Sequence, residues 1–241
     1  MNASARLDER APLNQSVERA ARLLSLFSVE EPELSLAELT ARLGTSKATA
    51  HRYATALRRA GLLRLSAGGY TLGPRIIELA GTALAGLRVV KVAGPYLERL
   101  VADVNETAVL SIWDGEAPVV VRVDDNTDRL VRINVRTGSR LPLDSAQGKI
   151  FRAFLGEEPD DDDLERVRRT GLAFNARIVE GIAALAAPVF QGDEIVAAMA
   201  LVGTTAAIAE EGEALLARRL RDAAAGLSAE LGFLRPKRRT A

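Results

Sequence analysis

The residues between Leu39 and Ile77 could bind phosphate groups, because this stretch contains several Arg and Lys residues and no Asp or Glu. The chain as a whole has equal numbers of acidic and basic side chains, 32 of each, so an acid-free stretch of this length is unusual. Its basic residues are Arg42, Lys47, Arg52, Arg58, Arg59, Arg64 and Arg75. Clustered cations without carboxylates are typical of a nucleic-acid-binding surface. The alternative is an ordinary solvated helix face.

Residues 46–61 of this stretch are predicted to form a helix. Ser46 is a good N-cap, and Gly61 is a typical residue just beyond a last helical turn. Helical spacing places one set of apolar residues on a buried stripe, namely Ala50, Tyr53, Ala54, Leu57 and Ala60. The opposite face carries Ala48, His51, Arg52, Thr55 and Arg59, with Lys47 and Thr49 at its flanks.

A shorter helix comes directly before this one. Ser35 and Glu38 form a capping box, and the helix that they open ends at Gly44. Two helices joined by so tight a turn form a helix-turn-helix unit, whose second helix enters the DNA major groove. We expect base-edge or phosphate contacts from Lys47, Thr49, His51 and Arg52, and mainly phosphate contacts from Arg58, Arg59 and Arg64. Ser46 would cap the helix and offer its backbone N–H to a phosphate.

Two further elements complete the predicted DNA-binding domain, residues 14–75. Short apolar runs on both sides of Gly68 and Gly69 predict a β-hairpin, which is either the wing of a winged helix or a purely structural hairpin. A first helix is expected from Ser16 to about Phe27, after a disordered lead of residues 1–13. Its predicted stripe is Val17, Ala20, Ala21, Leu24 and Phe27.

Composition argues against most enzyme classes. The chain has no Cys and only one His, His51, which lies on the predicted DNA-reading helix. A catalytic triad or a zinc site would therefore lack partners, and no P-loop, nucleophile elbow or dinucleotide fingerprint occurs. We expect no cofactor, no metal and no enzymatic activity. The polar N-terminus and the absence of a long apolar run predict a cytoplasmic protein without a membrane span.

The remainder of the chain, residues 76–241, is predicted to be a second, α+β domain. Pro74 opens a linker helix of residues 74–89, whose apolar stripe packs on its own domain or on a second subunit. Strands are expected at residues 107–113, 119–123, 129–135, 182–190 and 194–202, and helices at 95–104, 145–155, 164–169 and 210–234. The acidic run of residues 157–165 is expected to cap the helix that follows it. These elements form an antiparallel sheet with helices at both ends, and its apolar walls suit a ligand pocket.

Several segments carry a resemblance to a known family. They are SVERAARLLSLF, LSLAELTARLGTSKATAHRYATALRRAGLL, YTLGPRIIELA, RLPLDSAQGK and GIAALAAPVFQGDEIVAAMALVG. In this order, from about Asn14 to Leu234, the chain resembles the IclR family of bacterial transcriptional regulators. The resemblance implies a winged helix-turn-helix domain, a GAF-like effector-binding domain, homodimers or dimers of dimers on double-stranded operator DNA, and a small, usually organic-acid effector. It places effector contacts at Ser145, Ala146, Gln147, Asn175, Arg177, Ala184, Val202, Gly203 and Thr204.

Two pocket segments depart from the family pattern. LPLDSAQGK is one residue shorter than usual and has Asp144 where His is common, and Asn175 and Arg177 replace acidic residues. One hypothesis is that Arg177 clamps an effector carboxylate, and the alternative is a surface Arg177 paired with Glu180. The expected function is a ligand-responsive DNA-binding regulator. Its rivals are a dimeric regulator without a ligand and a small-molecule enzyme fused to a DNA-binding module.

Overall fold

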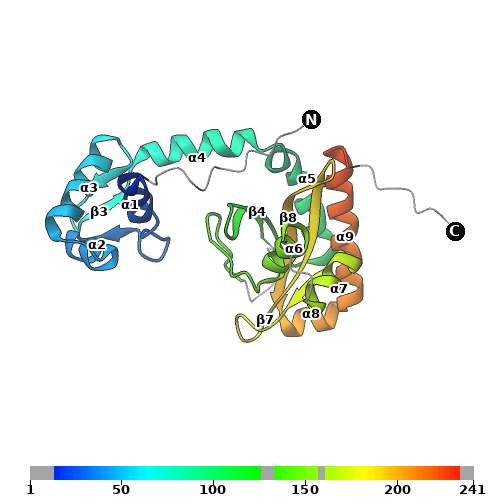
Figure 1. Ribbon diagram of the computed structural model, residues 1–241. Helices are drawn as coiled ribbons and strands as arrows, with labels where there is room; N and C mark the ends of the chain where they lie inside the picture. Colours follow the sequence, from blue (N-terminus) through cyan, green and yellow to red (C-terminus); the bar gives the residue numbers. More distant parts are fainter. Residues whose placement is uncertain (1–13, 126–132, 157–160, 234–241) are drawn as a thin grey trace. The chain divides into compact units, whose positions relative to one another are not determined.

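The computed structural model describes residues 14–125, 133–156 and 161–233, and Figure 1 shows the arrangement of their elements. The predicted lead, residues 1–13, and most of the predicted strand at 129–135 lie outside these ranges. Contacts divide the chain into two compact units, residues 1–83 and 84–241, and the division falls within helix α4 (Pro74–Gly86). Within the described ranges, no helix has the length and apolar character needed to cross a membrane.

The first unit is a three-helix domain with a small sheet. Its helices are α1 (Gln15–Leu24), α2 (Leu36–Leu43) and α3 (Lys47–Arg59), and its strands are β1 (Glu33–Leu34), β2 (Leu63–Leu65) and β3 (Tyr70–Leu72). The strands are antiparallel in the order β1-β3-β2. The capping box of α2 and the left-handed Gly44 at its end are both present, which confirms the helix-turn-helix prediction.

Three details of this unit were predicted incorrectly. Helix α1 is capped by Asn14, whose Oδ1 accepts from the Ser16 N–H at 3.1 Å, and it ends at Leu24. The expected stripe is correct for Ala20, Leu24 and Phe27, which pack against the core, and wrong for Val17, which is 64% exposed, and for Ala21, which is also exposed. Leu23, which the stripe left out, is fully buried. Ala60 is the C-cap of α3 and is exposed, since the helix ends before it can pack. Strand β1 was not predicted, because its two residues are too few to show the alternating pattern of a strand.

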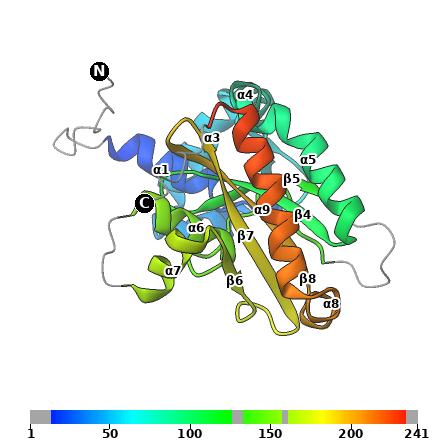
Figure 2. The same cartoon turned by 90° about the vertical axis from the view of Figure 1, so that its right-hand side faces the viewer.

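The second unit is built on a five-stranded antiparallel sheet in the order β5-β4-β8-β7-β6. Its strands are β4 (Thr107–Trp113), β5 (Pro118–Asp124), β6 (Ala173–Asn175), β7 (Ile182–Gln191) and β8 (Glu194–Thr204). Helices α5 (Arg88–Val104) and α9 (Glu213–Glu230) pack on one face, as Figure 2 shows for α9. Helices α6 (Ala146–Leu155) and α7 (Asp162–Thr170) belong to the core on the other face, and α8 (Thr205–Glu211) follows β8.

Alternation along the strands supplies both cores. Leu110 and Met199 point to the face with α5 and α9, whereas Val109 and Ala198 point to the face with α6 and α7. Strand β4 and the β7–β8 hairpin lie where the sequence predicts them. The acidic run also caps α7 as expected, because the Asp161 carboxylate accepts from the Asp163 and Leu164 amides at 3.0 and 3.1 Å.

Three predictions for the second unit were wrong in extent. Helix α5 was expected to begin at Pro95 but begins at Arg88, so that Pro95 lies inside it. The cost of the hydrogen bond that proline cannot donate is offset by the burial of the apolar face of the helix. The closing helix is split at Gly212, which has a φ of 85°, and Leu215 is 40% exposed. Residues 133–135 form no strand. The edge of β5 is instead covered by residues 138–141, through a Val120 N–H to Ser139 O bond of 2.9 Å.

Gly148, in the first turn of α6, lies where a side chain does not fit. A Cβ added there would contact Leu143 O and lie 2.6 Å from Pro142 O, and both are backbone atoms. We expect Gly148→Ala to destabilise the protein by about 1–3 kcal/mol in denaturant unfolding, because the loop before α6 must move.

Gly81 is the matched control for this substitution. It lies inside α4 and would place its Cβ in open space. Gly81→Ala should therefore raise the free energy of unfolding by about 0.5–1 kcal/mol. If Gly148→Ala were as stable as the unmodified protein, the close approach of the loop to α6 would be wrong.

Candidate DNA interface and effector cavity

Helix α3 presents the predicted contact face to solvent. Ser46 caps it, with its Oγ accepting from the Thr49 N–H at 3.2 Å, and the Ser46 hydroxyl donates to Thr49 Oγ1 at 3.0 Å. Lys47, His51 and Arg52 are exposed on its surface, while Ala54 and Leu57 are buried beneath. The guanidinium of Arg52 lies 5.8 Å from the Tyr53 ring centroid, a cation–π distance. The Ser46 and Thr49 hydroxyls are therefore hydrogen-bonded to each other at the helix cap. The cations of this face, Lys47 and Arg52, are exposed to solvent.

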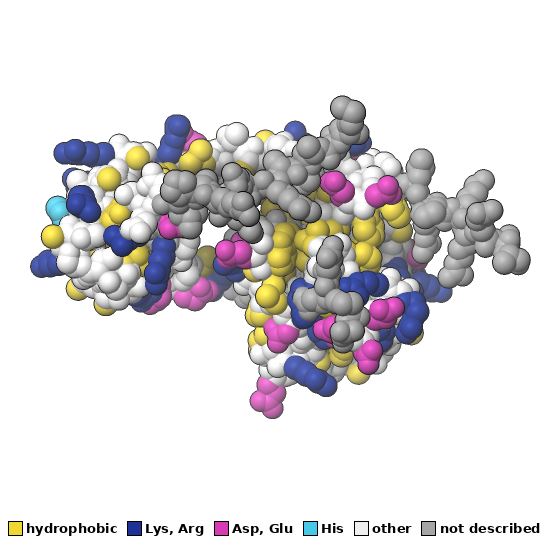
Figure 3. All heavy atoms as spheres, in the orientation of Figure 1, with side chains coloured by type: hydrophobic (Ala, Val, Ile, Leu, Met, Phe, Trp, Pro, Cys, Tyr) yellow, Lys and Arg dark blue, Asp and Glu magenta, His cyan; other side chains and the backbone are white. Residues whose placement is uncertain are grey.

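Ion pairing separates the basic residues of the acid-free stretch into two groups. Arg42 forms a bidentate pair with Glu31 at 2.6 Å, and Arg75 pairs with Glu78 at 2.8 Å. The other five have no acidic partner among the described residues: Lys47, Arg52, Arg58, Arg59 and Arg64. All five lie on α3 or β2, and Figure 3 shows Lys and Arg side chains over this region. The uncompensated positive charge therefore coincides with the predicted DNA-contacting elements.

The hairpin of β2 and β3 is held at its tip by an acidic side chain. The Glu33 carboxylate accepts from the Ser66 hydroxyl and from the Gly68 N–H, the latter at 2.7 Å. These hydrogen bonds, the Ser66 bond foremost, lower the pKa of Glu33 below its ordinary value of 4.5. On the same hairpin, Arg64 Nε donates to Thr71 Oγ1 at 2.9 Å, which fixes the direction of the arginine stem.

We expect Glu33→Ala to loosen the hairpin tip. Hydrogen exchange at the Gly68 amide should become faster, and operator affinity should fall a few-fold, because the tip loses its anchor. In the unmodified protein the anchor is present above pH 4.5 and is lost as the pH falls through the lowered pKa of Glu33.

Glu33→Gln is the control, since its side-chain oxygen still accepts from Gly68 and Ser66. It should keep most of the protection of the Gly68 amide and remove the pH dependence. Equal exchange rates in the alanine variant and the unmodified protein would show that the tip does not need this carboxylate.

A cavity of about 300 Å³ lies beside the sheet of the second unit, on the side of α6. Six of the nine predicted effector residues line it: Ser145, Ala146, Gln147, Asn175, Ala184 and Val202. They come from the start of α6, from β6 and from the paired ends of β7 and β8. The walls are largely apolar and polar groups are few, as is usual for a small-molecule site.

The start of α6 supplies the most deeply buried polar groups of this cavity. Ser145 is 6% exposed and caps the helix, with its Oγ accepting from the Gly148 N–H at 3.0 Å. Gln147 is 4% exposed. The positive end of the helix dipole therefore points toward the cavity wall, where it would stabilise an anionic ligand.

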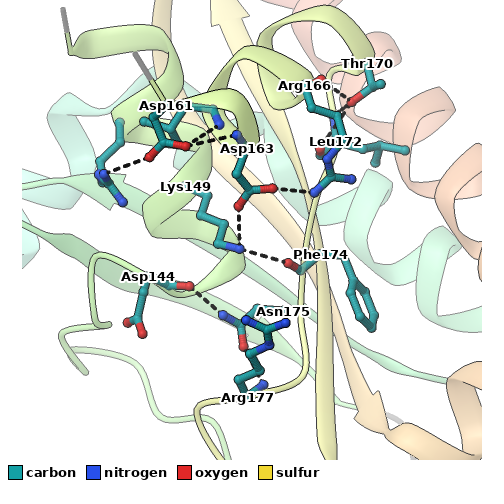
Figure 4. A network of polar contacts seen from close by, with 12 residues as sticks. Asp144, Lys149, Asp161, Asp163, Arg166, Thr170, Leu172, Phe174, Asn175 and Arg177 are labelled. Atoms are coloured by element: carbon teal, nitrogen blue, oxygen red, sulfur yellow. Dashed lines mark hydrogen bonds and ion pairs between the residues drawn. The ribbon is translucent and has the colours of Figure 1, made fainter. Parts of the chain in front are cut away.

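Figure 4 shows how polar contacts tie α6 to β6 and α7. Asn175 Nδ2 donates to Asp144 O at 2.6 Å, and Asn175 Oδ1 accepts from the Arg177 N–H at 2.8 Å. Lys149 Nζ pairs with Asp163 at 2.7 Å, and this pair is the largest cause of the lowered pKa of the Asp163 carboxyl. The unusual Asn175 thus fixes the loop before α6 through the backbone of Asp144.

Three predicted effector residues do not line the cavity. Arg177 is exposed, and no Arg177–Glu180 ion pair forms within the described part of the chain. Gly203 packs against the Glu106 carboxylate, and Thr204 caps α8 by accepting from the Ala207 N–H at 3.1 Å.

Sequence reasoning missed a segment that lines the cavity. Ile133, Asn134, Val135 and Arg136 line it, together with Ser139 and Leu141. Arg136 is the cationic lining residue among those that the structure describes. The alternating apolar pattern of residues 129–135 indicated a strand. The signal that could have revealed a ligand-binding role was Arg136, the cationic residue that follows this pattern.

Comparison with known proteins assigns both units. Residues 16–66 match the IclR helix-turn-helix domain, and residues 81–162 and 161–229 match the C-terminal domain of bacterial transcriptional regulator IclR. The chain belongs to the IclR family. This IclR-family protein is a DNA-binding transcriptional regulator with an effector-binding C-terminal domain, and it is not an enzyme.

Individual relatives cover nearly the whole IclR-family chain. The DNA-binding transcriptional repressor YiaJ of Escherichia coli is 28% identical, over 96% of this chain and 93% of YiaJ. A solved regulator of the family from Alicyclobacillus acidocaldarius is 27% identical, with a TM-score of 0.77 and coverage of 92% of this chain and 100% of that one. An IclR homologue of Microbacterium hydrocarbonoxydans, solved in complex with 4-hydroxybenzoate, shares the fold at 22% identity and a TM-score of 0.75, over 90% and 98% of the two chains.

Proposed function

We propose that this regulator reads an operator with α3 and that a small organic acid in the cavity beside α6 changes its operator affinity. Arg52, Lys47, Thr49 and His51 contact base edges or phosphates in the major groove, and the Ser46 backbone N–H meets a phosphate. Arg58, Arg59 and Arg64 neutralise phosphates and make binding salt-dependent. The five cations of α3 and β2 that have no acidic partner in the described ranges support this assignment.

The effector proposal rests on the cavity that the start of α6, β6 and the ends of β7 and β8 form together. Its volume of about 300 Å³ suits an acid with one ring or a short chain. Arg136 and the N-terminus of α6 supply positive charge for a carboxylate. The bound 4-hydroxybenzoate of the Microbacterium homologue is an acid of this class. Three of the predicted effector residues do not line the cavity and would affect effector binding only through the residues that do: Arg177, Gly203 and Thr204.

A thermal-shift screen of small carboxylic acids tests the effector proposal. At least one acid should raise the melting temperature of the unmodified protein and change its affinity for its own upstream DNA, since a ligand stabilises the state that it binds. Arg136→Ala should weaken the binding of that acid. If no acid stabilised the protein, the second unit would serve dimerisation alone.

We also propose that the regulator is a homodimer, or a dimer of dimers, that acts in the cytoplasm where bacterial operators lie. Helix α4, whose residues the structure describes in full, buries none of them in the single chain, and Ile77 is 75% exposed. A second subunit would cover such residues. The double substitution Ile77→Asp and Leu79→Asp should lower the mass measured by light scattering, and an unchanged mass would assign the contact to another surface.

A further inference from the structure

A second cavity in the C-terminal unit has a different chemical character from the effector cavity. It has a volume of about 520 Å³ and is formed by the end of α7, the second half of β7 and the middle of α9 (elements labelled in Figure 2). The two cavities share strand β7 but use opposite ends of it: Ile182 to Ala184 line the first, and Ala187, Pro188 and Phe190 line the second. A ligand in one therefore does not occupy the other.

The rim of this second cavity is strongly basic. Arg168 and Arg169 come from α7, Arg218 and Arg221 come from α9, and Asp222 is the single acidic residue of the described lining. The whole chain has no net charge, so this excess of cations is local. Arg169 and Arg218 make no ion pair or hydrogen bond within the described ranges, and Arg221 uses its Nε on Ala217 O of its own helix at 3.3 Å. Their guanidinium groups suit a bidentate contact with an anion.

Three aromatic rings form an apolar wall of the same cavity. Phe154 meets Phe190 edge to face with centroids 5.3 Å apart, and Phe190 stacks on Phe233 at 5.0 Å. The buried Ser228 fixes this wall, because its hydroxyl accepts from the Phe190 N–H at 3.0 Å and donates to Ala224 O at 2.7 Å. All three rings are partly exposed, so a planar ligand could extend the row by stacking.

We propose that this cavity is a second ligand site, which binds an aromatic carboxylate: the ring stacks on the phenylalanine row and the carboxylate bonds to the arginine rim. Its volume falls in the range of small-molecule sites. The aromatic wall selects a flat apolar ring, and the arginines select a negative charge. A neutral aromatic compound meets only the first requirement and a simple inorganic anion only the second.

Titration calorimetry of the full chain with 2-naphthoate tests this site. The double substitution Arg218→Glu and Arg221→Glu should weaken 2-naphthoate binding by about tenfold or more, because two attractive contacts become repulsive. Both residues are exposed on α9, so the variant should keep the melting temperature of the unmodified protein. The uncharged isostere 2-naphthamide and the non-aromatic cyclohexanecarboxylate should each bind less tightly than 2-naphthoate.

Two controls distinguish binding at this site from a general charge effect and from binding in the effector cavity. Arg219→Glu changes a neighbouring exposed arginine of α9 that does not line the cavity, and it should leave the affinity unchanged. Ala184→Phe, which fills the effector cavity, should also leave it unchanged. The proposal would be overturned if Ala184→Phe removed 2-naphthoate binding while the double variant kept it. It would also be overturned if 2-naphthoate did not bind. A changed oligomeric mass of the double variant would then assign the rim to a contact between copies.

Discussion

Arg52→Ala should weaken binding to the operator by about 5- to 150-fold and flatten the preference for operator over random DNA. The reason is that Arg52 lies on the exposed face of α3 and has no acidic partner in the described structure, and that we propose it reads a base edge. A base-reading arginine contributes about 1–3 kcal/mol of discrimination, whereas a phosphate contact contributes equally on any sequence. Fluorescence anisotropy with operator and scrambled duplexes measures both affinities.

Arg58→Ala is the matched control for Arg52→Ala. Arg58 lies on the last turn of the same helix and is expected to contact a phosphate. Its loss should weaken binding to both duplexes alike and lower the slope of affinity against salt by about one. If Arg52→Ala also weakened binding to both duplexes alike, Arg52 would be a phosphate contact. Lys47, Thr49 and His51 would then be the remaining candidates on α3 for reading base edges.

Ala184→Phe should abolish the response to effector and leave effector-free operator binding intact. Ala184 lies on β7, is half-buried, and lines the cavity beside α6 opposite Val202. A phenyl ring there would occupy much of a space of about 300 Å³. We expect effector affinity to fall by about a hundredfold or more, because the ligand and the ring cannot share the cavity. The measurement is calorimetry with the acid found in the screen.

Ala214→Phe controls for the added aromatic side chain. Ala214 is exposed on α9 and lines neither the effector cavity nor the second cavity. This variant should respond to effector like the unmodified protein, with a similar melting temperature. An Ala184→Phe variant that still bound effector with full affinity would place the effector elsewhere.

The DNA-binding unit was largely predictable because its signals are local. A capping box at Ser35 and Glu38, a left-handed glycine at Gly44, an N-cap at Ser46 and a Gly-Gly turn each determine the backbone within a few residues. The errors occurred where tertiary contacts decide. Pro95 lies inside α5 although proline normally marks a helix start, because burial against the sheet outweighs the lost hydrogen bond.

The cavity was only partly predictable for the same reason. Ser145 and Gln147 follow a recognisable motif, so resemblance could locate them. Arg136 directly follows the segment 129–135, whose alternation indicated a strand. Only the folded structure shows that residues 133–136 line the cavity, while residues 138–141 cover the edge of β5. The basic rim of the second cavity gave no signal at all, because Arg169 and Arg218 are far apart in the sequence and meet only when α9 packs beside β7.

Effector-dependent operator binding is the central claim, and one titration tests it most directly. The purified protein is titrated against a fluorescent duplex from its own upstream DNA, at two salt concentrations, with excess random DNA and with or without the acid found in the screen. We predict specific binding that survives the competitor, weakens with salt and shifts when the acid is added. Binding that random DNA removes, or specific binding that no acid alters, would contradict the claim.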